Sequence, residues 1–215
     1  EMSASLVGSE MCIRDSHKDI HSITASQVFG VPIDKVTSQM RRSAKAVNFG
    51  IIYGISSFGL GKDLGISAKK AKEYIDKYFE TYSDVKKYMD ENVEKAKRDG
   101  YITTLFGRRR VINELKSSNY NVRSFGERAA MNMPLQGSSA DIIKIAMINV
   151  YKKLNECNLR ARLVLQVHDE LVIDCPEEEK DIVSGILKTE MENAVALKVP
   201  LTVEVGCGKN WFAAK

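Results

Sequence analysis

The stretch RRSAKAVNFGIIYG, residues 41 to 54, decides how the rest of the chain is interpreted. Four of its residues recur at every fourth position, and at 3.6 residues per turn they stay on one side of an α-helix: Arg41, Lys45, Phe49 and Tyr53. Cations bind phosphate and aromatic rings stack on sugars or bases, so this face could hold a phosphorylated ligand lengthwise. The spacing alone fits a basic, solvent-facing surface helix equally well.

The identity of the residues separates these two interpretations. The pattern Arg-x3-Lys-x3-Phe-x3-Tyr-Gly, with Asn48 before the Phe, resembles the fingers-helix motif of family-A DNA polymerases. We expect the helix to run from about Lys35 to Ile55, with Gly54 near its end as a helix breaker.

A second informative stretch is RSFGERAAMNMPLQGSSAD, residues 123 to 141. Arg128, Asn132 and Gln136 share one face if the stretch is helical. Pro134 lacks an amide hydrogen and would clash with the carbonyl four residues earlier, so we expect a break or kink there, with Gln136 projecting from it. The motif Asn132-x-Pro134-x-Gln136-Gly137 again resembles the polymerase family, and the resemblance implies that this face contacts the minor groove at a primer terminus. Every matched base pair presents acceptors there, so donor side chains can check its shape.

The third stretch is RLVLQVHDELVID, residues 162 to 174, in which two β-prone runs flank a polar triplet. It predicts a hairpin with Asp169 and Glu170 at the tip, where carboxylates could bind Mg²⁺. Acidic residues are also common in ordinary turns. Gln-Val-His-Asp-Glu resembles the third polymerase motif, which implies Asp169 and Glu170 as metal ligands and His168 as a contact to DNA.

An earlier helix, from Asp19 to before Gly30, carries His21 near its beginning. A lone histidine is more often a structural or surface residue than a ligand. Asp-Ile-His at this distance before Arg41 resembles the family segment whose histidine reaches the nucleotide phosphates, so the resemblance implies that role for His21.

The segments between these motifs predict mostly helix. GISSFGLGKD, residues 54 to 63, lacks the glycine spacing of a P-loop and is expected to be a turn between helices. Ser67 then precedes one long charged helix, Ala68 to Arg98, whose inner side carries Tyr74, Ile75, Tyr78, Phe79, Tyr82, Val85 and Tyr88. Residues 101 to 112 have the pattern of a β-hairpin that carries three arginines. The tail predicts a helix over Glu177 to Leu197 and a strand over Leu201 to Val205.

Composition sets wider limits on the protein class. With 44% hydrophobic and 28% charged residues, the chain has the balance of a soluble globular protein. Lys+Arg 32 against Asp+Glu 28 gives a net charge of +4, which permits a polyanionic partner without arguing for one. No apolar run approaches a membrane span. The chain has four cysteines, Cys12, Cys157, Cys175 and Cys207. They lie far apart and lack the spacing of zinc ligands, so we expect reduced thiols in the cytoplasm.

The resemblance covers nearly everything from His17 to Lys215, and it implies a helix-rich α+β fold. Family-A fingers helices over residues 17–125 would be followed by the C-terminal part of an antiparallel palm sheet over residues 126–215. The hairpin motif Thr-x-x-Gly-Arg-Arg would lie at the base of the fingers. Residues 1–16 resemble nothing in the family and are interpreted as a disordered or foreign leader, such as a read-through product.

The resemblance also implies template-directed nucleotidyl transfer, in which two Mg²⁺ ions align a primer hydroxyl with the α-phosphate of a deoxynucleoside triphosphate. Asp169 would help to hold the metals. His21, Arg41 and Lys45 would bind the triphosphate, with Lys45 as a proton donor to pyrophosphate. Phe49 would lie against the sugar and favour a 3′-hydroxyl, and Tyr53 would lie beside the nascent base pair.

One family feature is missing. The second metal-binding carboxylate belongs to an Asp-Tyr-Ser-x-x-Glu segment that this chain lacks. We therefore expect a truncated, monomeric fragment with little activity alone, acting with primer-template DNA in the bacterial cytoplasm near the nucleoid. A non-catalytic DNA-binding or nucleotide-binding module and a purely structural remnant remain alternatives.

Overall fold

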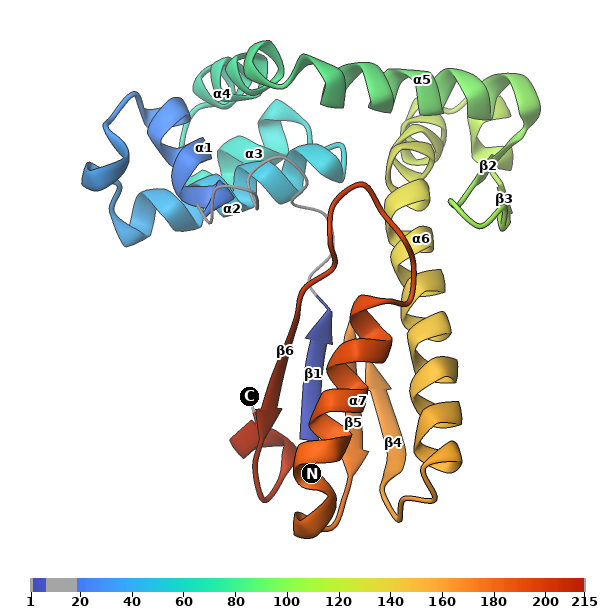
Figure 1. Cartoon of the computed structure of the whole chain (residues 1–215). Coiled ribbons are helices and arrows are strands. Elements are labelled where there is room, and N and C mark those ends of the chain that lie inside the picture. Colours follow the sequence, from blue (N-terminus) through green and yellow to red (C-terminus); the bar gives the residue numbers. More distant parts are fainter. Residues whose placement is uncertain (1, 7–18, 215) are drawn as a thin grey trace. The chain divides into compact units, whose positions relative to one another are not determined.

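A computed structural model describes residues 2–6 and 19–214 (Figure 1). The fold is helix-rich α+β, as expected. The chain divides into two compact units, one made of the first residues with Gln136–Lys215 and the other ending at Leu135. This division and the expected boundary after residue 125 both fall inside helix α6 (Tyr120–Glu156).

The unit that ends at Leu135 is mainly helical. Its elements are α1 (Ile20–Phe29), η2 (Ile33–Lys35), α2 (Ser38–Ile52), α3 (Ser57–Leu64), α4 (Ala68–Thr81), α5 (Ser83–Asp99), β2 (Tyr101–Thr103), β3 (Arg109–Val111), η3 (Asn113–Lys116) and the first part of α6. At the starts of four helices, backbone N–H groups donate hydrogen bonds to the side-chain oxygens of the capping residues Asp19, Thr37, Ser56 and Ser67. These caps satisfy donors that have no partner within their helix.

Three expected elements differ from the structure. Helix α2 is shorter than the expected Lys35 to Ile55, because Thr37 caps a new start and Val36 is extended. Helix α3 replaces the turn expected after Gly54, since the Ser56 hydroxyl caps it. The single long helix is two helices, because Tyr82 leaves helical geometry at φ −117° and ψ 60°.

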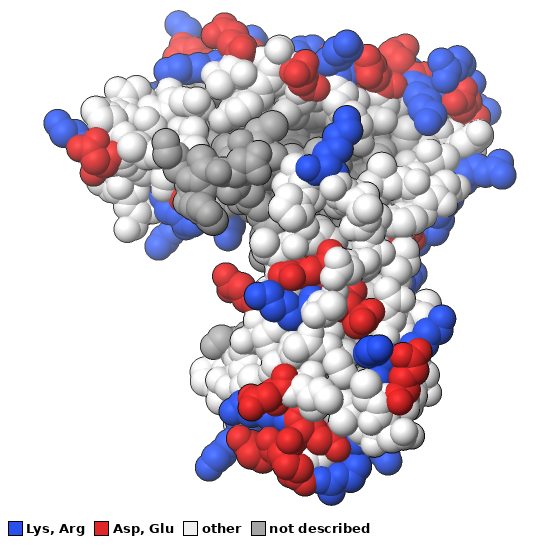
Figure 2. All heavy atoms as spheres, viewed as in Figure 1, with Lys and Arg blue, Asp and Glu red and all other residues white. Residues whose placement is uncertain are grey.

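Two cores hold this unit together. One joins α2, α3, α4 and α5 through buried Val47, Ile51, Leu60, Ala71, Tyr78 and Met89. The other joins α5, the β2–β3 hairpin, η3 and α6 through Val93, Ala96, Ile102, Ile112, Leu115, Ala130 and Met133. Most of the aromatic side of α4 and α5 is buried or half-buried, but Tyr88 is exposed, contrary to expectation. Lys/Arg and Asp/Glu are interspersed along α4 and α5 in the space-filling view (Figure 2).

Helix α6 continues through Pro134, so of the expected break or kink the break is absent and the kink stays a prediction. Pro134 removes one helical hydrogen bond and crowds the carbonyl of Ala130. Residues on both sides of it are packed, however, with Ala130 and Met133 in one core and Ile142 and Ile143 in another. Tertiary packing on both sides therefore holds the helical path despite the proline.

The other unit is a four-stranded sheet with strand order β4-β5-β1-β6 and antiparallel neighbours. Its elements are β1 (Met2–Leu6), β4 (Arg162–Val167), β5 (Glu170–Asp174), η4 (Glu177–Glu179), α7 (Lys180–Glu192), β6 (Val203–Cys207) and η5 (Trp211–Ala214). The core between the sheet, α7 and the end of α6 includes Ala146, Val150, Leu171, Ile173, Val183 and Leu187. The tail helix is thus shorter than the expected Glu177 to Leu197, and the last strand begins two residues later than expected.

Strand β1 corrects the interpretation of the N-terminus. Residues 1–16 were expected to be disordered or foreign, but Met2–Leu6 pairs with both β5 and β6. In this register Met2 lies opposite Ile173 on one side and Cys207 on the other. The expectation of disorder is therefore wrong for residues 2–6, while residues 7–16 lie outside the described residues.

Two glycines of this unit should respond oppositely to alanine. A Cβ at Gly185, inside α7, meets nothing within 4 Å, whereas one at Gly206 would lie 1.9 Å from the carbonyl oxygen of Ala214. Gly185→Ala should therefore raise the free energy of unfolding by about 0.5 to 1 kcal/mol. Gly206→Ala should lower it by about 1 to 3 kcal/mol. Urea unfolding of the two variants measures both changes, and shifts of the same sign would contradict the packing described for Gly206.

Candidate functional site

The face of α2 predicted from the sequence is exposed in the structure. Arg41 and Lys45 are exposed, as are Phe49 (46%) and Tyr53 (42%), the last forming the C-cap. The opposite face is buried through Ala44, Val47, Asn48 and Ile51. One side of α2 thus anchors the helix, and the other presents two cations followed by two rings. The structure gives this geometry, and the ligand-binding role stays a prediction.

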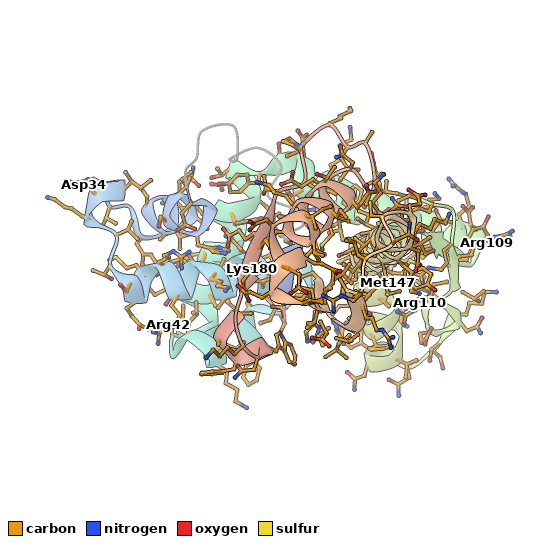
Figure 3. The ribbon with its side chains drawn as sticks, turned by 60° about the horizontal axis from the view of Figure 1, so that its bottom comes forward. Asp34, Arg42, Arg109, Arg110, Met147 and Lys180 are labelled. Atoms are coloured by element: carbon orange, nitrogen blue, oxygen red, sulfur yellow. The ribbon has the colours of Figure 1, made fainter. Side chains whose placement is uncertain are left out.

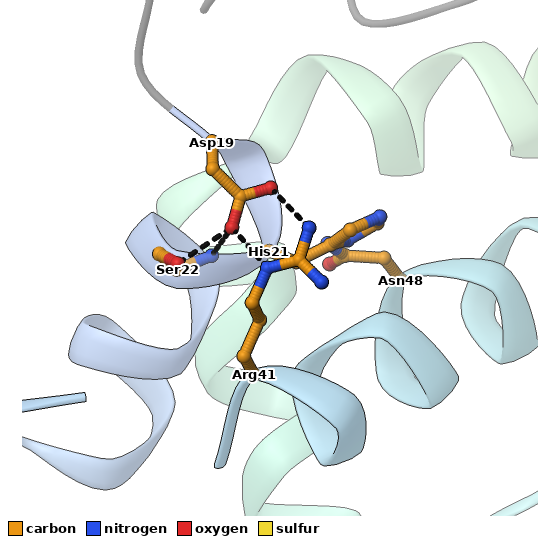
Figure 4. Close-up of polar contacts among 5 residues, drawn as sticks. All are labelled: Asp19, His21, Ser22, Arg41 and Asn48. Atoms are coloured by element: carbon orange, nitrogen blue, oxygen red, sulfur yellow. Dashed lines mark hydrogen bonds and ion pairs between the residues drawn. The ribbon is translucent and has the colours of Figure 1, made fainter. Parts of the chain in front are cut away.

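Arg41 is oriented by a carboxylate from the start of α1 (Figure 4). The Asp19 carboxylate accepts from Arg41 Nε at 2.6 Å and from Nη2 at 3.0 Å. The same carboxylate caps α1 by accepting from the Ser22 backbone N–H at 3.0 Å. The hydrogen bond from Arg41 is the main reason that the pKa of Asp19 lies well below its ordinary value of 3.8. Asp19 therefore links the beginnings of α1 and α2, a role that the sequence analysis missed.

His21 lies beside the same face but is mostly buried, with 8% of its surface exposed. Asn48 Nδ2 and His21 Nδ1 are 3.1 Å apart, and the His21 and Phe49 ring centroids are 5.9 Å apart. Buried polar groups need such partners. The contact orients the imidazole from α2, and it assigns to Asn48 a positioning role that the sequence analysis did not predict.

Lys45 differs from Arg41 in its partners. Its Nζ lies 5.8 Å from the centroid of the Phe49 ring, a cation–π contact one turn along the helix. Within the described residues it has no ion pair with a carboxylate. Its positive charge is therefore available for an incoming anion.

The Asp19–Arg41 pair should make stability depend on pH. Because folding lowers the pKa of Asp19, its contribution is fully present above the unfolded value near 4 and is lost as the pH falls through the lower folded value. Both side chains are partly exposed, so solvent screening limits the effect to about 1 kcal/mol or less. Urea unfolding should show parent and Asp19→Asn differing at pH 7 and converging below about pH 4. A difference that persists at low pH would refute the linkage.

Helix α6 brings Arg128, the first residue of the second predicted face, next to the end of α2. Arg128 donates from Nη1 to the Ser124 hydroxyl at 2.9 Å. Gly54 has φ +69°, and a Cβ there would lie 2.8 Å from Cγ of Arg128. The stem of Arg128 thus packs against the residue that follows Tyr53. Asn132 has a buried Oδ1 that makes no hydrogen bond within the described part of the chain, and Gln136 belongs to the sheet unit.

The acidic turn lies between β4 and β5. His168 and Asp169 connect the strands, with His168 in the left-handed region at φ +51°, and Gln166 Nε2 donates to the His168 carbonyl at 2.6 Å. Glu170 is the first residue of β5 rather than part of the tip, because it pairs with Val167. Its Oε2 accepts from Trp211 Nε1 at 3.2 Å.

The carboxylates at this turn could supply some of the ligands of a hard divalent cation. Asp169 and Glu170 are both partly exposed and supply the oxygen ligands that Mg²⁺ prefers. Over residues 2–6 and 19–214, however, there is no group of three or more His, Cys, Asp and Glu side chains that could hold a metal ion. The two residues therefore fit one side of a metal site, and they do not by themselves complete it.

The β2–β3 hairpin forms as expected and carries Arg109 and Arg110 on β3 (Figure 3). The Arg109 guanidinium lies 5.4 Å from the centroid of the Tyr101 ring on the partner strand. At the turn, the Thr104 hydroxyl accepts from the backbone N–H groups of Phe106 at 3.3 Å and Arg108 at 3.1 Å. The turn is thus ordered locally, and its arginines are exposed to contact an anion.

Known proteins resemble this chain in sequence over most of its length. Residues 6–213 match DNA polymerase family A, and the chain belongs to that family. It is 60% identical over 197 residues to DNA polymerase I of Caldicellulosiruptor bescii and 56% identical over 197 residues to that of Bacillus subtilis. Each alignment covers 92% of this chain, but only 23% and 22% of those proteins. The chain therefore spans about a quarter of the length of these curated relatives.

A solved structure is similar over the whole fold. It is the POL domain of Pol1 from M. smegmatis in complex with DNA primer-template and dNTP, with a TM-score of 0.93 and 42% sequence identity. The similarity covers 99% of this chain and 40% of that one. None of the helices described here is long and apolar enough to span a membrane.

Proposed function

We propose that this chain provides the nucleotide-binding and primer-binding parts of a DNA-directed DNA polymerase, which transfers nucleotides onto a primer along a template. The observation that carries the proposal is the exposed row of two cations and two aromatic rings on α2, oriented by α1 and packed next to α6. Membership of DNA polymerase family A supports it. So does the similar structure, which contains DNA primer-template and dNTP.

The α2 face would bind the incoming deoxynucleoside triphosphate. Successive members of the row are about 6 Å apart along the helix axis, a spacing that would let Arg41 and Lys45 bind different phosphates of one triphosphate. Lys45 would donate a proton to the leaving pyrophosphate. Phe49 would lie against the sugar and Tyr53 beside the new base pair, and the rings' exposed surface would be covered by the ligand. His21, fixed by Asn48, would support the phosphate end.

The face of α6 would contact the primer terminus. Arg128, Asn132 and Gln136 lie at four-residue intervals on one continuous helix, so their side chains project from one side. Donor groups there can bind the purine N3 and pyrimidine O2 acceptors that every matched pair presents in the minor groove. His168, at the acidic turn, is a further proposed DNA contact.

Asp169, with Glu170, would hold Mg²⁺, which when bound stabilises negative charge on the reacting phosphate. Strand β1, which lies beside this turn, has the sequence MSASL without an acidic residue, and Ser5 is the position opposite Glu170. Two-metal chemistry requires more carboxylate ligands than this turn supplies. We therefore propose that the 215-residue chain has little polymerase activity alone, and that it acts as a monomer in the bacterial cytoplasm near the nucleoid.

Primer extension tests this function directly. A labelled primer on a short template is incubated with the chain, Mg²⁺ and all four deoxynucleotides, beside the Asp169→Asn variant. We expect no extension by either protein but binding of primer-template DNA by both. Extension by the parent alone would overturn the proposed inactivity while supporting the polymerase function. A chain that binds neither DNA nor nucleotide would overturn the function itself.

The incomplete acidic site also favours a second candidate, a non-catalytic module that binds DNA or nucleotide through α2 and α6. Such a module would bind DNA without a divalent metal, and Asp169→Ala would leave the affinity unchanged. Metal-dependent binding that weakens in Asp169→Ala would exclude this candidate.

A further inference from the structure

The C-terminal turn η5 contacts the face of the sheet opposite α7. Leu171 and Ile173 of β5 belong to the core formed with α6 and α7. Because successive side chains of a strand point to opposite faces, Glu170 and Val172 face away from that core. Trp211, the first residue of η5, hydrogen-bonds to Glu170 on this second face.

Two glycines allow this close approach. Val203 and Val205 of β6 pack on the core side, so Gly206 faces the same side as Glu170. A Cβ at Gly206 would lie 1.9 Å from the Ala214 carbonyl oxygen, and one at Gly208 would lie 2.6 Å from the Ala213 carbonyl carbon. Any other residue at these positions would displace η5 from the sheet.

The turn itself is ordered by its own hydrogen bonds. The Asn210 side-chain oxygen accepts from the Ala213 N–H at 2.9 Å, and the Asn210 carbonyl accepts from the N–H groups of Ala213 and Ala214, each at 3.1 Å. Ala214 is 6% exposed. A turn fixed at both ends in this way holds the Trp211 indole in a defined place.

The chemistry of the contact matters as much as its position. The indole N–H is a donor only and carries no charge, so it can orient the Glu170 carboxylate without neutralising it. An Arg or Lys in the same place would form an ion pair and compete with a cation for the carboxylate. The Trp211–Glu170 bond of 3.2 Å therefore constrains the Glu170 carboxylate without placing a positive charge on it.

We propose that Trp211 is a positioning residue, which holds the Glu170 carboxylate beside Asp169 in the orientation that receives a divalent cation. The C-terminal turn is then part of the acidic site, although it lies about forty residues away in sequence, Trp211 and Glu170 being 41 positions apart. The role of the cation rests on the proposed function, whereas the positioning contact itself does not.

The contact can be tested without metal, because Trp211 is the sole tryptophan of the chain. It gives a single indole N–H signal in an NMR spectrum. Glu170→Ala should shift this signal, because the indole N–H loses its carboxylate acceptor, and should speed its exchange with water about ten-fold. Glu170→Gln keeps an acceptor oxygen and should leave the signal near that of the parent. The control is Phe212→Ala, next in the turn, whose side chain is 91% exposed. An indole signal unchanged in Glu170→Ala would overturn the proposal.

The effect on cation binding is measured with Mn²⁺, whose binding is followed by electron paramagnetic resonance. Trp211→Phe keeps an aromatic ring but loses the donor, and it should weaken the Mn²⁺ affinity about three- to ten-fold. Phe212→Ala should leave the affinity unchanged. Equal affinity in the parent and a folded Trp211→Phe, or no Mn²⁺ binding by the parent, would overturn the positioning role. Nucleotide binding through Lys45 is read separately, so failure here is distinguishable from failure of the proposed function.

Discussion

Lys45→Ala should weaken the binding of a deoxynucleoside triphosphate about 30-fold, since removing one charge-assisted hydrogen bond to phosphate costs about 2 kcal/mol. Lys45 is the residue of choice because its ammonium group has no carboxylate partner in the described part of the chain, whereas Asp19 already engages Arg41. Isothermal titration of the chain with a deoxynucleotide measures the change.

A charge-matched control separates local binding from general electrostatics. Lys69→Ala removes one positive charge from an exposed site in the first turn of α4, away from the α2 face in sequence and on another helix. It changes the net charge as Lys45→Ala does, and it should leave nucleotide affinity within about two-fold of the parent, because exposed charges are screened by salt. Equal weakening by both variants would show that α2 holds no specific phosphate site.

The contribution of Arg41 to nucleotide binding can be tested through its partner Asp19. Asp19 holds the guanidinium at Nε and Nη2, so phosphate binding must add to this pair or compete with it. If Asp19 acts mainly by positioning Arg41, Asp19→Asn should weaken nucleotide binding about three-fold, because the guanidinium then loses a fixed orientation. Tighter binding in Asp19→Asn would instead show that the carboxylate competes with the nucleotide.

Sequence patterns predicted the elements whose residues interact mainly with near neighbours. The four-residue spacing on α2 follows from the helix period, and the two β-prone runs around the acidic turn form the paired strands β4 and β5. The three sequence motifs also led to the family to which the chain belongs. Local periodicity therefore predicted these elements, and the residues of the motifs predicted the family.

Contacts between distant segments could not be predicted in this way. Asp19 and Arg41 are 22 positions apart, and Gly54 meets Arg128 across a much longer stretch. No periodicity identifies such partners, because they depend on how helices pack. Asp19 caps α1 through Ser22, three residues away, whereas its bond to Arg41 joins two helices and depends on the fold.

Helix continuity departs from local propensity in opposite directions at Tyr82 and at Pro134. Tyr82 ends α4 without a glycine or proline to signal it, and its side chain still packs against the same core as Tyr78 and Val85. Pro134 gave a clear local signal for a break, yet α6 continues because packing on both sides outweighs one lost hydrogen bond. In both cases tertiary packing overrode local propensity.

Arg128→Ala should weaken binding of a matched primer-template about ten-fold, through loss of the proposed donor to the minor-groove acceptors. The salt dependence identifies which contact is lost. A minor-groove contact leaves the slope of log affinity against log salt nearly unchanged, whereas loss of a phosphate contact reduces it by about one. A mismatched primer terminus displaces the acceptors, so the variant should also discriminate less between matched and mismatched ends.

A pair of glycine variants tests whether the placement of Arg128 beside Gly54 matters for this contact. Gly54 and Gly65 have nearly the same backbone angle, φ +69° and +66°, so alanine strains both similarly. Only at Gly54 does the new Cβ meet Arg128, at 2.8 Å from Cγ, while at Gly65 nothing lies within 4 Å. Gly54→Ala should therefore weaken DNA binding several-fold and Gly65→Ala should not. Equal DNA binding by the two variants would mean that α2 does not position Arg128.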